Sequence, residues 1–90
     1  MSENLNREYK SSFTDAVIET LTAFANTNGG EVLVGVDNNG VAIPGYTIGA
    51  ENIQQYINEI KNKTRPSIVP EVEINALNGT EVLKFSVQEF

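Results

Sequence analysis

The amino-acid sequence predicts an α+β fold, a two-layer sandwich in which two helices cover one mixed β-sheet. Two segments, residues 13–27 and 50–63, carry apolar residues every three to four positions, which is typical of amphipathic helices. Shorter segments rich in β-branched residues are bounded by Gly, Asn or Pro, as strands are. The resulting order, β-α-β-(β)-α-β-β with a short third strand, favours helices packed on one face of a sheet.

The first helix follows a short opening strand, "REYK", at residues 7–10. Ser12 with Asp15 fits a capping box at the start of this helix, and Thr14 is the alternative cap. Its apolar face comprises Phe13, Val17, Ile18, Leu21, Phe24 and Ala25. Gly29 follows the end of this pattern and is expected to adopt the left-handed conformation that terminates helices.

The segment "EVLVGVD" at residues 31–37 is predicted as the next strand. Alternation places Val32, Val34 and Val36 on one face and Leu33, Gly35 and Asp37 on the other. The pair Asn39-Gly40 indicates a type I′ hairpin turn. Residues 41–46 are then expected to pair back briefly before Pro44 interrupts the strand.

The second half of the chain predicts a helix and a hairpin. Arg65-Pro66 ends the helix at 50–63, whose apolar stripe comprises Ile53, Tyr56, Ile57 and Ile60. In the strand at 70–76, the residues expected to face inward are Val72, Ile74 and Ala76. Asn78-Gly79 predicts a turn. The last strand, 81–87, places on one face Leu83, Phe85 and Val87.

Composition limits the chemistry that this chain can perform. It has 90 residues, enough for one small domain, with a net charge of −6 and neither cysteine nor histidine. Disulfides and cysteine-ligated metals are therefore excluded, and catalysis would depend on carboxylates, lysines, hydroxyls or a metal held by oxygens. No apolar run reaches the roughly 18 residues that a membrane span needs. We therefore expect a cytoplasmic protein without a membrane partner.

Three carboxylates form a candidate metal site. If the opening strand pairs beside the strand at 31–37, then Glu8 and Asp37 approach each other, with Glu3 adjoining. Oxygen ligands of this kind suit Mg²⁺ or Mn²⁺, and Gly35 would leave room for a ligand. Lys10 is expected on the strand face of Glu8, where it would separate the two negative charges. The alternative is structural, with Asp37 acting only as a turn residue.

One basic cluster is present, at the end of the second helix. It consists of Lys61, Lys63 and Arg65, and Lys10 lies elsewhere in the chain. Cations here either complement the helix dipole in solvent or contact the phosphates of a nucleic acid. The chain has only six Lys and Arg, which argues against strong non-specific binding to nucleic acids.

Four motifs give the chain a resemblance to the Schlafen/Alba-like domain family. They are "E-x4-EYK" from Glu3, "AFANTNGG" at 23–30, "VLVGVDNNG" at 32–40 and the later Gly45. The resemblance spans nearly the whole chain and implies an Alba-like α+β fold. It also implies DNA or RNA binding, as the N-terminal part of bacterial and archaeal transcriptional regulators. In eukaryotic Schlafen proteins a related domain cleaves structured RNA with three carboxylates, which match Glu3, Glu8 and Asp37 here, with Lys10 beside them.

Three functions follow from these patterns. The first is a nucleic-acid-binding, and specifically DNA-binding, module of a transcriptional regulator. The alternatives are an endoribonuclease that uses Mg²⁺ or Mn²⁺, and a module for self-association only. Because the family domain usually continues past residue 90, we expect residues 1–90 to be the N-terminal domain of a longer protein. An uncovered sheet edge would seek a partner, which predicts a homodimer.

Overall fold

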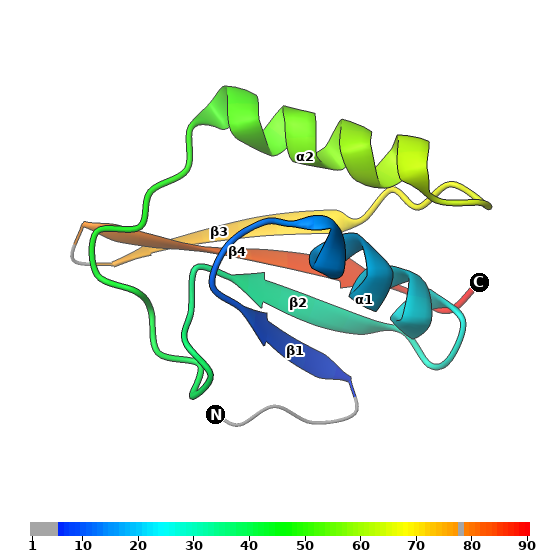
Figure 1. The fold of residues 1–90 in the computed structure, drawn as a ribbon, viewed down its shortest axis with the longest axis horizontal. Coiled ribbons are helices and arrows are strands. Elements are labelled where there is room, and N and C mark those ends of the chain that lie inside the picture. The colour runs from blue at the N-terminus through cyan, green and yellow to red at the C-terminus, as the bar shows by residue number, and fades with distance from the viewer. Residues whose placement is uncertain (1–5, 78) are drawn as a thin grey trace.

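The computed structural model describes residues 6–77 and 79–90 and has two layers, a four-stranded sheet and a pair of helices (Figure 1). The elements are β1 (Arg7–Lys10), α1 (Asp15–Ala25), β2 (Gly30–Val34), α2 (Ala50–Lys63), β3 (Glu71–Leu77) and β4 (Thr80–Val87). The strands lie in the order β1-β2-β4-β3. β1 is parallel to β2, whereas the other pairs are antiparallel, so the predicted mixed sheet with two helices is confirmed. No helix in these ranges is long and apolar enough to cross a membrane.

Helix α1 connects the two parallel strands and begins at Thr14, its N-cap. The Thr14 hydroxyl accepts a hydrogen bond from the Ala16 N–H, at 3.3 Å, and its backbone is extended. The capping box predicted at Ser12 is therefore wrong, because the alternative cap Thr14 already satisfies a free N–H of the first turn. At the other end Gly29 has a φ of 80° and donates its N–H to the Phe24 carbonyl over 2.7 Å. The predicted left-handed glycine is confirmed.

The core lies between the helices and one face of the sheet. In the register of the central strands, Val32 lies opposite Phe85 and Val34 opposite Leu83, and all four side chains are fully buried. Burial of this kind is the main source of the stability of a small domain. Helix α1 contributes its predicted face, with the five buried side chains of Val17, Ile18, Leu21, Phe24 and Ala25. The predicted inward face of β4 is confirmed by Leu83 and Phe85.

Helix α2 packs on the same face of the sheet but buries fewer of its side chains than α1 does. Its only fully buried side chain is Ile60, while Ile53 and Tyr56 are partly covered and pack against the core. The Tyr56 ring stacks on Phe13 with ring centroids 4.1 Å apart, which joins α2 to the segment that precedes α1. At the helix end the buried Thr64 hydroxyl donates to the Ile60 carbonyl and accepts from the Ile68 N–H.

Strand β2 ends at Val34, earlier than the predicted residue 37, because Gly35 has a φ of 98°. Both Gly35 and Val36 donate their N–H groups to the Lys10 carbonyl, a two-to-one pattern typical of a β-bulge. A Cβ at Gly35 would lie 2.8 Å from the Tyr46 ring and 2.9 Å from the Glu81 carbonyl oxygen. The interpretation that Gly35 leaves room for a ligand is therefore wrong, since Tyr46 fills that space.

The turn after β2 has a different centre from the predicted one. Gly40 donates its N–H to the Asp37 carbonyl over 3.0 Å, so the central residues of the turn are Asn38 and Asn39. The predicted type I′ turn is therefore wrong, because it placed Asn39 and Gly40 at the centre of the turn. The short returning strand is reduced to one bridge, between Val36 and Ala42.

The hairpin of β3 and β4 completes the sheet, and β3 forms its outer edge. Val72 lies opposite Phe85 and packs against the core, as predicted. Ile74 lies opposite Leu83 on the same face but is 45% exposed, and Ala76 is also exposed. The prediction that these two face inward into the core is wrong, because the core does not extend to this part of the edge strand. Asn78 of the predicted turn lies outside the described residues.

Candidate functional site

The sheet face opposite the helices carries a row of alternating charges. Arg7 on β1 pairs with Glu31 on β2. Lys84 on β4 lies 3.8 Å from Glu31 and 3.2 Å from Glu73 on β3, measured from its Nζ to a carboxylate oxygen. Positive and negative side chains therefore alternate across all four strands, and each is close to an opposite charge. This row, Arg7-Glu31-Lys84-Glu73, is called the charge ladder below.

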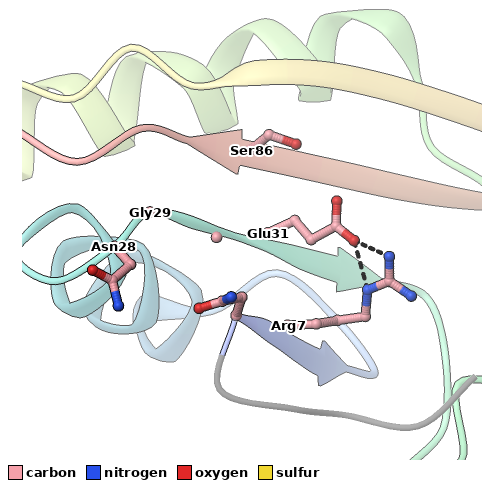
Figure 2. A pocket seen from close by; sticks show the side chains of 7 residues that line it. Arg7, Asn28, Gly29, Glu31 and Ser86 are labelled. Carbon is pink, nitrogen blue, oxygen red and sulfur yellow. Dashed lines mark hydrogen bonds and ion pairs between the residues drawn. The ribbon is translucent and has the colours of Figure 1, made fainter.

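A shallow hollow of about 560 Å³ adjoins one end of the charge ladder (Figure 2). It is lined by Asn6, Arg7, Asn28, Gly29, Gly30, Glu31 and Ser86. Figure 2 shows the Arg7 side chain turned toward the Glu31 carboxylate. Because Glu31 neutralises Arg7, the hollow offers amide and hydroxyl groups rather than a net positive charge. It suits a neutral polar group better than a phosphate.

Motif spacing alone does not predict this hollow. It forms because the parallel register aligns Arg7 with Glu31, and the antiparallel register aligns Glu31 with Ser86. Asn28 and Gly29 come from the connection between α1 and β2, which reaches the same end of the sheet. The available signal in the sequence was the segment "NTNGG", but its strand partners follow only from the strand order.

Two of the three candidate carboxylates have polar partners of their own. Glu8 pairs with Lys10 on the same strand, with 3.4 Å between the Lys10 Nζ and the Glu8 Oε2. The Asp37 Oδ1 accepts hydrogen bonds from the N–H groups of Asn39, at 2.8 Å, and Val41, at 3.0 Å. These bonds give Asp37 a structural role in its turn.

The third candidate, Glu3, lies outside the described residues. Within residues 6–77 and 79–90, no three acidic side chains are placed to hold one metal ion. Glu8 and Asp37 have the oxygen donors that Mg²⁺ or Mn²⁺ prefers, although the Asp37 Oδ1 already accepts two N–H groups. The site of Glu3, Glu8 and Asp37 stays a prediction.

Replacing Asp37 separates the turn role from the metal role. Asp37→Ala removes both accepted hydrogen bonds and is expected to lower the free energy of unfolding by about 1 kcal/mol, measured by urea denaturation. Asp37→Asn keeps an acceptor oxygen and is expected to lose much less. Mn²⁺ is then titrated calorimetrically into the wild type and Asp37→Asn. Binding that the asparagine variant lacks supports the metal site, whereas equal and negligible binding by both leaves Asp37 as a turn residue.

Three exposed cationic side chains gather where α2 ends. They are Lys61, Lys63 and Arg65, and this group is called the α2 basic end below. The Arg65 guanidinium donates from one nitrogen to the carbonyls of Asn62 and Thr64, which fixes its position. The Lys63 Nζ lies 3.0 Å from the Asp15 Oδ1, and this hydrogen bond and charge raise the pKa of Lys63.

Lys61 has no carboxylate partner among the described residues. The ion pair of Lys63 with Asp15 is between side chains that are 51% and 71% exposed, and such surface pairs contribute little to stability. A phosphate can therefore compete with Asp15 for Lys63. The three other cations of the chain are less exposed than Lys63 and each lies near a carboxylate, Lys10 near Glu8 on β1, and Arg7 and Lys84 in the charge ladder. Lys10 thus lies on a different element from the α2 basic end.

The two-layer arrangement makes this an α+β domain, and the family follows from the match of its sequence to a family model. The family model described as "Schlafen, AlbA_2" matches residues 3–90. The chain belongs to the Schlafen AlbA_2 family, so the resemblance found in its motifs is confirmed. No curated protein matches its sequence.

Two solved structures share the fold. The DIP2311 protein from Corynebacterium diphtheriae superposes with a TM-score of 0.68 at 20% identity, over 94% of this chain and 18% of that one. The N-terminal domain of a RecG-related protein from Nitrosomonas europaea gives a TM-score of 0.64 at 21% identity, over 99% of this chain and 66% of that one. This chain therefore spans less than a fifth of the first neighbour and about two thirds of the second. At these identities the likeness shows the fold.

Proposed function

We propose that this domain is a nucleic-acid-binding module, specifically a DNA-binding module of a transcriptional regulator, and that the α2 basic end contacts phosphates. One observation carries the proposal. In the described part of the chain, this end is where three exposed cations lie within five residues, and Lys61 there has no carboxylate partner. Membership of a nucleic-acid-related family supports it.

The charge distribution limits the strength of this binding. The net charge is −6, and the remaining cations face carboxylates. About three phosphate contacts give a log–log dependence of affinity on salt with a slope near −2.7 on duplex DNA. The module therefore binds weakly at physiological salt and contributes to recognition together with other parts of a longer protein.

Fluorescence anisotropy with a labelled DNA duplex at low salt tests the proposal. Lys61→Ala removes the cation that has no carboxylate partner among residues 6–77 and 79–90, and it is expected to weaken binding and to reduce the salt slope by about 1. The matched control is Lys84→Ala, which changes the net charge equally but lies in the charge ladder on the opposite sheet face. The affinity of Lys84→Ala for the DNA duplex is expected to stay near that of the wild type.

Several results would contradict this proposal. Absence of salt-dependent binding to DNA, single strands and structured RNA would overturn it. Equal losses in Lys61→Ala and Lys84→Ala would show a net-charge effect and no site at the α2 basic end. Lys10→Ala is expected to have a smaller effect than Lys61→Ala, because Glu8 already neutralises Lys10.

The proposal also includes pairing of the domain as a homodimer. The sheet has two outer strands, and an uncovered strand edge offers unpaired N–H and C=O groups to another chain. Self-association without any nucleic-acid binding is the alternative, and the anisotropy experiment separates the two. Cleavage of structured RNA with Mn²⁺, lost in Glu8→Gln, would instead support the ribonuclease.

A further inference from the structure

The outward face of helix α2 carries a group of exposed carboxamide side chains. Ile60, the buried residue of this helix, marks the side that faces the core. Successive residues turn by about 100° around a helix axis, so Asn58 and Asn62 both leave the helix about 160° away from Ile60. Both are exposed, as are Gln54 and Gln55 one turn earlier. These four residues, Gln54, Gln55, Asn58 and Asn62, are called the amide face below.

The amide face is open to a large ligand. The Gln54 Nε2 donates to the Asn58 Oδ1 over 3.2 Å, which orients the Asn58 carboxamide and leaves its NH₂ group to donate elsewhere. Within residues 6–77 and 79–90, the side chains of Gln55 and Asn62 have no hydrogen-bond partner. Figure 1 shows α2 at the margin of the molecule, with no other helix or strand drawn on its outer side.

Charged side chains border the amide face on both flanks. Lys61 and Lys63 are two residues apart, so they leave the helix about 160° from each other, on opposite flanks. Lys63 lies on the flank next to α1, where it pairs with Asp15. Glu59 lies on this flank too, but Lys63 follows it by four residues, so the two are neighbours on the helix surface and their charges offset each other. The flank of Lys61 carries no carboxylate of α2.

We infer that α2 enters the major groove of B-form DNA, with the amide face against the base edges and the α2 basic end against the phosphates. This inference rests on the proposed function and names the surface that would give it sequence preference. A helix with its side chains is about 10–12 Å wide, and the major groove is about 12 Å wide. Lys61 then contacts one phosphate strand, while Lys63 exchanges Asp15 for the phosphates of the other strand.

The chemistry of the amide face selects adenine. In the major groove, the side-chain oxygen of Asn or Gln accepts a hydrogen bond from adenine N6, while its NH₂ group donates to adenine N7. Asn58 and Asn62 are about 6 Å apart along the helix axis, close to twice the spacing of about 3.4 Å between successive bases. One helix can therefore contact two neighbouring A·T pairs with these two side chains.

Glu51 confines the contact to the later turns of α2. It lies on the outward side of the first turn, about 10 Å before Asn58 along the axis. DNA phosphates repel this carboxylate, so the helix approaches with its C-terminal end, where the cations lie. Glu51→Gln is therefore expected to raise the affinity for every DNA duplex without changing the base preference.

Fluorescence anisotropy with three labelled duplexes tests the groove and the base. Alternating adenine–thymine and inosine–cytosine duplexes present the same minor groove, because inosine lacks the 2-amino group of guanine, but different major grooves. At low salt the wild type is expected to bind the adenine–thymine duplex at least tenfold more tightly. An adenine–uracil RNA duplex, whose deep and narrow major groove excludes side chains, is expected to bind at least tenfold more weakly than its DNA counterpart.

Substitutions separate base contacts from phosphate contacts. Asn58→Ala and Asn62→Ala are each expected to reduce the preference for adenine–thymine over inosine–cytosine DNA at least threefold, with the salt slope near that of the wild type. Asn52→Ala is the matched control, since it is the same deletion at an exposed residue of α2 that lies about 100° from the centre of the amide face. Its preference is expected to be unchanged, and Lys61→Ala is expected to weaken binding to both DNA duplexes equally.

Three results would overturn the inference. They are equal affinity for the two DNA duplexes, a preference that survives both asparagine substitutions, and binding to the RNA duplex as tight as to DNA. If DNA affinity still falls with salt and with Lys61→Ala, each of these results leaves the proposed function standing. Absence of binding to all three duplexes overturns the inference and the proposed function together.

Discussion

Replacing Phe85 by alanine is expected to lower the free energy of unfolding by about 3–5 kcal/mol. Phe85 is the largest fully buried side chain, and it lies opposite Val32 on β2 and Val72 on β3. Its ring also contacts Phe13, with centroids 5.8 Å apart. The substitution leaves a cavity that the two central strands cannot close, because both sides of the site are fixed in the sheet.

A loss of this size is comparable to the whole stability of a domain of 90 residues, which is on the order of 5–13 kcal/mol. Urea denaturation followed by circular dichroism measures it. The matched control is Phe90→Ala, the same deletion at a side chain that is 56% exposed, where a change under about 1 kcal/mol is expected. Similar losses in the two variants would contradict the position of Phe85 at the centre of the core.

Replacing Gly29 by valine is expected to lower the free energy of unfolding by at least about 2 kcal/mol. Two effects add at this position. A φ of 80° is unfavourable for any residue with a Cβ, and most unfavourable for a β-branched one. A Cβ here would also lie 2.8 Å from the Val87 carbonyl oxygen and 3.2 Å from the Glu89 N, both of them backbone atoms.

The control for Gly29 is Gly45→Val. Gly45 has a φ of 77°, nearly the same as Gly29, but a Cβ there meets no atom within 4 Å. The difference between the two melting temperatures therefore isolates the steric contact with β4 from the backbone strain. Equal melting temperatures for the two variants would mean that the end of α1 does not approach the end of β4 as closely as described.

The regular elements follow from local sequence patterns, which is why they are predictable. Helix α2 matches its predicted bounds, 50–63, because its apolar stripe is flanked by a glycine and by Arg65-Pro66. Two of the errors occur where contacts outside the local pattern decide the structure, whereas the cap of α1 and the centre of the turn after β2 were misplaced among neighbouring residues. Tyr46 fills the space beside Gly35, and the core stops short of Ile74, and neither fact is present in the local pattern.

The candidate site is less predictable for the same reason. The sequence indicated that Glu8 and Lys10 share a strand face, because their separation of two is a property of every strand, and they do form an ion pair. The hollow beside Arg7, in contrast, depends on which strands are neighbours. Strand order is a tertiary property, so residues from β1, β2 and β4 could not be assigned to one surface from their spacing.

The small buried surface of α2 affects how easily this helix unfolds locally. Opening of α2 alone exposes one buried side chain of that helix, Ile60, whereas opening of α1 exposes five buried side chains. Local unfolding of α2 therefore costs less free energy, and its amide hydrogens exchange with solvent sooner than those of α1 and the central strands. Since two residues of the α2 basic end, Lys61 and Lys63, belong to this helix, a phosphate chain bound there would slow that exchange and stabilise the helix.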